Sequence, residues 1–72
     1  VMTKPEIKAA VDRHLPFSLL MSDGKSYYVR HEDYISFPPH QNRVIVSDDL
    51  GHIWVLDLDD MTSIQYEEQK QP

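Results

Sequence analysis

The sequence predicts a mainly β domain with an N-terminal helix, in which five short antiparallel strands form a small, strongly bent barrel with the helix at one end. Two observations predict this fold. Apolar residues recur at helical spacing as far as residue 14, and from Phe17 onward they alternate with a period of two. The alternating segments are short and are separated by turn-forming residues, beginning with Asp23-Gly24. A barrel is favoured because closure hides strand edges; an open sheet with the helix across one face is the alternative.

Length and composition limit the chain to one domain over residues 1–72. A chain of this size buries only about 60% of the surface that it exposes when unfolded, so its core is marginal. The sequence contains no cysteine, which excludes disulfides and zinc–thiolate sites. Association with another subunit or with a ligand is the expected source of further stability.

The first element is expected to be a helix over about residues 4–15. Thr3 is placed to cap it, and Glu6 follows three residues later to complete a capping box. Pro16 disfavours helical geometry at the residue before it, which ends the helix. One narrow apolar face is formed by Ile7, Ala10, Val11 and His14.

The five strands are expected over about residues 17–67, followed by a polar tail at 68–72. Asp23-Gly24 predicts a two-residue type I′ hairpin between the first two strands. Residues 31–42 contain two consecutive prolines and are expected to form an irregular loop. The later strands are expected at Val44–Val46, His52–Leu58 and Met61–Tyr66, with a tight acidic turn at Asp57–Asp60.

The strand around Trp54 can face the core in two ways, because all its central residues are apolar. In the first interpretation Ile53 and Val55 point inward, and Trp54 points outward as an interface residue. In the second, Trp54, Leu56 and Leu58 belong to the core and the other two are outside.

The order of elements resembles the Sm-like barrel of Sm, LSm and bacterial Hfq-type proteins over residues 4 to about 67. The residues that carry the resemblance are Leu19-x-Met21-x-Asp23-Gly24, Val44-Ile45-Val46 and the turn from Asp57 to Ile64. It implies a homo-oligomeric ring in which His52–Leu58 of one subunit pairs with Ser63–Tyr66 of the next. The interface residues that it implies are Trp54, Leu56, Ile64 and Tyr66. Residues 17–64 also resemble small bacterial proteins of unknown function.

Members of this family bind single-stranded RNA, and the resemblance implies a base-stacking platform of Tyr34, Phe37 and His40. The second RNA-contacting turn of the family is basic, whereas here it contains Asp57, Asp59 and Asp60. The acidity is also uneven: residues 1–43 carry six bases and five acids, and residues 44–72 carry one base and seven acids. Negative charge at this turn repels phosphate, so RNA binding is the alternative rather than the first hypothesis.

No catalytic, cofactor or metal site is predicted. The four histidines lack the spacing of metal ligands, and turn formation explains the paired aspartates better than calcium binding does. His14 is expected to act as a favourable cation at the C-terminus of the helix, and His31 to bond to a nearby turn. No secretory leader or membrane span is recognised. The sequence therefore predicts a cytoplasmic, non-enzymatic protein that assembles with itself and acts in assembly or interaction.

Overall fold

The computed structural model describes residues 2–67, so the polar tail predicted at 68–72 lies outside the described residues. Within this range the chain forms one α-helix, two 3-10 helices and six strands. In chain order they are α1 (Lys4–Asp12), β1 (Phe17–Met21), β2 (Ser26–Val29), η1 (Glu32–Tyr34), β3 (Ile35–Ser36), β4 (Arg43–Ser47), β5 (Ile53–Asp57), η2 (Leu58–Asp60) and β6 (Met61–Tyr66).

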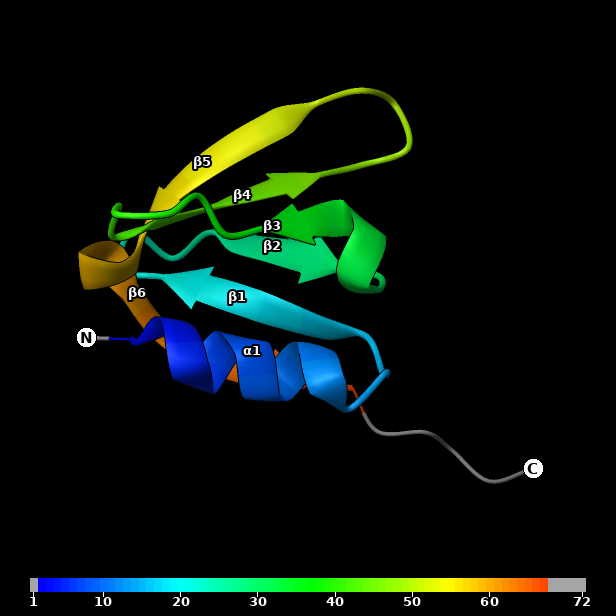
Figure 1. The fold of residues 1–72 in the computed structure, drawn as a ribbon, viewed down its shortest axis with the longest axis horizontal. Helices are drawn as coiled ribbons and strands as arrows, with labels where there is room; N and C mark the ends of the chain where they lie inside the picture. The colour runs from blue at the N-terminus through cyan, green and yellow to red at the C-terminus, as the bar shows by residue number, and fades with distance from the viewer. Residues whose placement is uncertain (1, 68–72) are drawn as a thin grey trace.

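The strands form two antiparallel three-stranded sheets, ordered β2-β1-β6 and β3-β4-β5 (Figure 1). The chain crosses between the sheets at two corners, from β2 to β3 through η1 and from β5 to β6 through η2. The backbone pairs found in residues 2–67 do not join the sheets into one closed ring of strands. The prediction of a mainly β chain with an N-terminal helix is confirmed.

The core lies between the two sheets and the helix. Period-two alternation buries one side of β1, β4 and β5, and the helix contributes two residues of its apolar face, Ile7 and Ala10. The largest fully buried side chains are Phe17, Ile7, Leu19, Leu58, Met61, Val29, Val44 and Val46. Both sheets contribute to this set, so neither can bury its apolar face without the other.

The helix runs beside β1 (Figure 1) and is attached at both of its ends. Lys4 donates a hydrogen bond from Nζ to the carbonyl of Pro38, 2.8 Å away, in the loop between β3 and β4. The guanidinium of Arg13 lies 3.8 Å from the centre of the Tyr66 ring on β6. The two ends of the helix therefore contact β6 of one sheet and the β3–β4 loop of the other.

Both ends of the helix differ in detail from the prediction. Thr3 is the N-cap residue, but its hydroxyl donates to the Glu6 carboxylate at 2.8 Å instead of accepting a backbone N–H, so the capping box does not form. The helix ends at Asp12, before the expected residue 15. His14 follows with a φ of 58°, the left-handed conformation that stops a helix.

The turn between β1 and β2 is a three-residue loop, so the predicted two-residue type I′ turn is wrong. Met21 pairs with Lys25 through its N–H, and the N–H of Gly24 donates to the carbonyl of Met21. Gly24 has a φ of 89°, whereas Asp23 does not have a positive φ. This arrangement is the three-residue hairpin loop in which a turn is followed by glycine.

The segment expected to be an irregular loop contains η1 and a sixth strand. His31 accepts the N–H of Asp33 at Nδ1, 3.3 Å away, which confirms that His31 bonds to a nearby turn. Ile35 then pairs with Val46 and is buried, which makes β3 part of the second sheet. The count of five strands was too low because a two-residue strand gives no alternating pattern.

Candidate functional site

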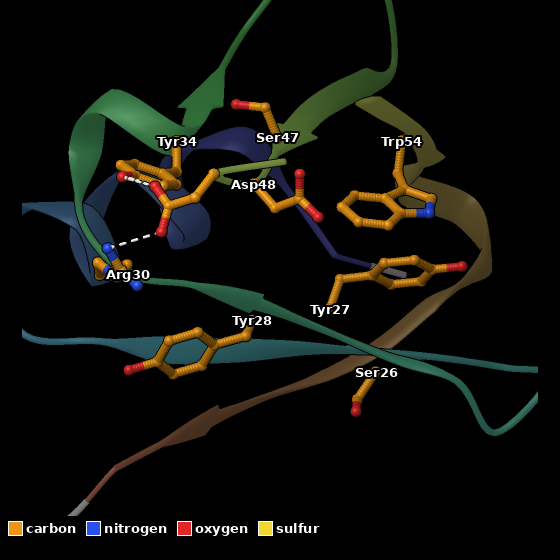
Figure 2. A pocket seen from close by; sticks show the side chains of 9 residues that line it. Ser26, Tyr27, Tyr28, Arg30, Tyr34, Ser47, Asp48 and Trp54 are labelled. Atoms are coloured by element: carbon orange, nitrogen blue, oxygen red, sulfur yellow. Dashed lines mark hydrogen bonds and ion pairs between the residues drawn. The ribbon is translucent and has the colours of Figure 1, made fainter. Parts of the chain in front are cut away.

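A surface pocket of about 320 Å³ lies between β2, η1 and the end of β4 with the loop that follows it (Figure 2). Four aromatic side chains line it: Tyr27, Tyr28, Tyr34 and Trp54. Three charged residues and two serines complete the lining: Arg30, Asp48, Asp49, Ser26 and Ser47. Because β2 is the edge strand of its sheet, its neighbouring tyrosines can both border a cavity along that edge.

Arg30 and Asp49 form an ion pair at one side of the pocket, with 2.9 Å between Nη1 and Oδ2. The Tyr34 hydroxyl donates a hydrogen bond to Oδ1 of the same carboxylate, and the Arg30 guanidinium lies 5.5 Å from the centre of the Tyr34 ring. The hydrogen bond to Asp49 raises the pKa of Tyr34 above 10.0, because the bond stabilises the protonated phenol. Two side chains thus fix the Asp49 carboxylate.

Asp48 organises the turn from β4 to β5. Its Oδ1 accepts the backbone N–H groups of Leu50 at 3.0 Å and His52 at 2.9 Å. Its Oδ2 lies 2.9 Å from Nδ1 of His52. The side-chain bond with His52 lowers the pKa of Asp48 below 3.8, and the backbone N–H groups add to this effect against a smaller opposing effect of desolvation.

Trp54 forms the opposite wall of the pocket and is half-buried. Its ring lies 5.7 Å from that of Tyr27 in a tilted pair, as Figure 2 shows. The His52 ring also lies 5.7 Å from Trp54. Asp48 projects between this aromatic pair and the Arg30–Tyr34 side (Figure 2), so the pocket has a carboxylate and an aromatic ring on each side.

The three residues predicted to stack RNA bases lie in different surroundings. Tyr34 belongs to the pocket. Phe37 packs against the core, and the Lys8 ammonium lies 5.4 Å from the centre of its ring. His40 is exposed in the loop before β4 with a φ of 60°. The described contacts therefore do not bring the three rings together on one surface.

The second of the two interpretations of β5 is correct. Leu56 and Leu58 are buried and Trp54 packs against the core, whereas Ile53 is 67% exposed and Val55 57% exposed. Trp54 and Leu56 face inward because they pair with Val46 and Val44 of β4, which are both fully buried. The outward interpretation of Trp54 is wrong.

The residues that the resemblance implied for a subunit interface therefore differ in exposure. Leu56 is in the core and Ile64 packs against it, whereas Tyr66 is 44% exposed under Arg13. The outward apolar residues of β5 are Ile53 and Val55. β5 and β6 are each the last strand of their sheet, so each has a free edge in the described chain.

The acidic turn forms η2, as a compact turn was predicted there. The Asp57 side chain caps it by accepting the N–H of Asp59 at 2.9 Å. Asn42 donates to the Asp59 carboxylate at 3.0 Å, and Asp60 is exposed. Asp57 therefore serves as a turn-forming residue, which accords with the preference of Asp for bonding to its local backbone.

Among residues 2–67, no three His, Cys, Asp or Glu side chains gather as metal ligands would. In the same part of the chain, no helix has the length and apolar character needed to cross a membrane.

Sequence reasoning did not identify the pocket. The sequence assigns Trp54 to the core or to an interface, Tyr34 to an RNA-stacking platform, and the paired aspartates Asp48 and Asp49 to turns. The pocket depends on the packing of β2 against a turn about twenty residues further along the chain, and no spacing rule connects them. The signals that the sequence does contain are two consecutive tyrosines, Tyr27-Tyr28, and two consecutive aspartates, Asp48-Asp49.

Comparisons of the chain with models of protein families, with curated proteins and with solved structures gave no match. The resemblance to Sm-like proteins therefore stays a prediction, and function has to be argued from the chain's own residues.

Proposed function

We propose that this chain is a non-enzymatic interaction module that assembles with copies of itself through the edge strands β5 and β6. The observation that carries the proposal is the outward face of β5, where Ile53 is 67% exposed and Val55 57% exposed beside a free strand edge. Exposed apolar residues on an edge strand favour pairing with another chain.

The Sm-like barrel and ring belong to the same proposal. Its support is the element order and the two corners at η1 and η2, where the chain passes from one sheet to the other. In such a ring β5 of one subunit pairs with β6 of the next. Because this core is small, the burial gained at each junction adds to the stability of every subunit.

Sedimentation velocity of the chain over a range of micromolar concentrations tests the proposal. We expect an oligomer that Val55→Lys dissociates, because the new charge would be buried at the junction. Leu50→Lys is the matched control, since Leu50 is 81% exposed in the loop and not on the strand. A monomer at every concentration, or equal dissociation by both variants, contradicts the proposal.

Single-stranded RNA binding is the alternative function. It has less support than self-assembly, because Tyr34 shares its pocket with the carboxylates of Asp48 and Asp49, and these repel phosphate. Titration with short uridine-rich and adenine-rich oligonucleotides at low salt decides it. Saturable binding that Tyr34→Leu weakens supports the alternative, and no binding at micromolar concentrations removes it.

A further inference from the structure

The aromatic pocket carries chemistry that self-assembly through β5 does not use. The paired rings of Tyr27 and Trp54 form one wall of a cavity at the surface, and Tyr28 borders the cavity from the next position of β2 with its ring directed away from that pair (Figure 2). The face of an aromatic ring carries partial negative charge, so a cation is attracted to it. Neutral apolar groups are attracted to such a wall through burial alone.

Two carboxylates, those of Asp48 and Asp49, line the same pocket as these rings. Asp48 projects between the two sides of the pocket, and Asp49 is fixed by Arg30 and Tyr34. Asp48 keeps its charge over a wide pH range, since its hydrogen bonds favour the ionised form. The pocket lining carries two negative charges and one positive charge, within a chain whose net charge is −5. Such a field attracts cations.

Two nitrogen-bearing side chains of the protein already lie against an aromatic ring and a carboxylate at this pocket. On one side, the Arg30 guanidinium lies over Tyr34 and pairs with Asp49. On the other side, the His52 imidazole lies beside Trp54 and bonds to Asp48. Each side therefore combines one ring, one carboxylate and one nitrogen-bearing group. The His52 side chain is 62% exposed, so a ligand can displace it from Asp48 without breaking the core.

The size of the pocket limits the ligand. A volume of about 320 Å³ lies at the lower end of the range for small-molecule sites, which is about 300–1,000 Å³. It suits one side chain or a small organic ion better than a nucleotide. The charge of the lining excludes a phosphate for the same reason that it attracts a cation.

We propose that this pocket binds an organic cation with an alkylated ammonium or guanidinium head, which packs against the paired rings of Trp54 and Tyr27 with its charge against Asp48 and with Tyr28 at the rim of the site. The cation is either a free small molecule or the side chain of a lysine or arginine on a partner protein. This proposal does not depend on self-assembly, because the pocket residues all belong to one chain.

The fluorescence of Trp54, the single tryptophan of the sequence, reports on the pocket directly. Choline is the first probe, and its neutral isostere 3,3-dimethyl-1-butanol is the control for shape. We expect choline to change the fluorescence saturably and to bind at least about tenfold more tightly than the isostere, because the ring faces and Asp48 act on the charge. Equal binding of the two probes, or no saturable change with choline, overturns the proposal.

Two variants test the residues. Asp48→Asn keeps the oxygen that accepts the backbone N–H groups and removes the charge, and we expect choline binding to weaken about fivefold. Tyr28→Leu removes a ring that is 49% exposed, and we expect a loss of about threefold. Asp23→Asn is the matched control, because Asp23 also accepts a backbone N–H in a turn, from Lys25 at 2.9 Å. An equal loss with Asp23→Asn means that net charge alone attracts the probe, which overturns the site.

A second arm distinguishes the sources of the cation. Peptides that contain one trimethyllysine or one arginine are compared with the same peptide carrying norleucine. If the cationic peptides bind at least about tenfold more tightly than choline, the ligand is a side chain of a partner protein, since neighbouring peptide contacts add affinity. If choline binds as tightly as the peptides, the ligand is a free small cation.

Discussion

Asp48 is the residue on which the turn between β4 and β5 depends most. One carboxylate oxygen accepts two backbone N–H groups and the other bonds to the His52 ring. These interactions favour the ionised carboxylate, which is why its pKa is lowered. A group whose pKa is lower in the folded chain stabilises that state above the pKa of the unfolded chain, and this contribution is lost as the pH falls through the lowered pKa.

We therefore predict that acidification opens this turn. The carboxyl carbon of Asp48, followed by NMR, should titrate at lower pH in the folded chain than in the urea-unfolded chain. The amides of Leu50 and His52 should exchange faster with solvent once Asp48 is protonated, because a neutral carboxyl oxygen is a weaker acceptor than a carboxylate oxygen. In Asp48→Asn, the exchange rates of these two amides should follow only the pH dependence of intrinsic amide exchange, because residue 48 no longer titrates. Titration of Asp48 at or above its unfolded value would contradict the assignment.

At the same scale, two residues adopt a backbone conformation that the sequence does not signal. His14 and His40 have φ values of 58° and 60°, a region that favours glycine and asparagine. His14 stops the helix in this way, so the helix ends earlier than Pro16 alone predicted. Single-sequence reasoning gave the correct place for the helix and the wrong mechanism for its end.

Among the elements, the hairpin of β1 and β2 depends on Gly24. Its φ is 89°, and a β-carbon built there would meet nothing within 4 Å. A substitution is therefore opposed by backbone strain alone and not by a clash. We predict that Gly24→Ala lowers the free energy of unfolding by about 1–2 kcal/mol. Gly24→Asn should lower it less, because asparagine tolerates a positive φ.

Urea unfolding followed by the fluorescence of Trp54 measures both variants of Gly24. A Gly24→Ala chain as stable as the original would mean that the loop relaxes to another turn type. The three-residue loop is supported if the free energy of unfolding is lowest for Gly24→Ala, intermediate for Gly24→Asn and highest for the original chain.

Some elements of the fold are predictable from the sequence pattern and others are not. The helix, the pairing of the first hairpin and the five longer strands were predictable because each leaves a local signal. The face that β5 buries was not, since Ile53 and Val55 are as apolar as Trp54 and Leu56. Pairing with the buried Val44 and Val46 decides it, and this register is a property of the tertiary structure. The pocket was missed for the same reason.

For the whole molecule, the two sheets and the helix share one small core. The buried apolar residues come from α1, both sheets and η2, and the chain connects the sheets at two corners. No element has a second apolar cluster of its own in the described chain. Loss of one central side chain should therefore weaken the packing of both sheets together, and unfolding should be a single cooperative transition.

Leu19 provides the sharpest test of this dependence, because it is fully buried on the central strand of its sheet and pairs with Tyr27 and Ile64. We predict that Leu19→Ala lowers the free energy of unfolding by about 2–5 kcal/mol. That loss is a large share of the roughly 5–10 kcal/mol available to a small domain. Leu50→Ala, at a residue 81% exposed, should change it by less than about 0.5 kcal/mol. Urea denaturation followed by both far-UV circular dichroism and Trp54 fluorescence, which report different parts of the fold, should give coincident transitions for all three chains. Separate transitions in Leu19→Ala would mean that the two sheets unfold independently and that the core is not shared.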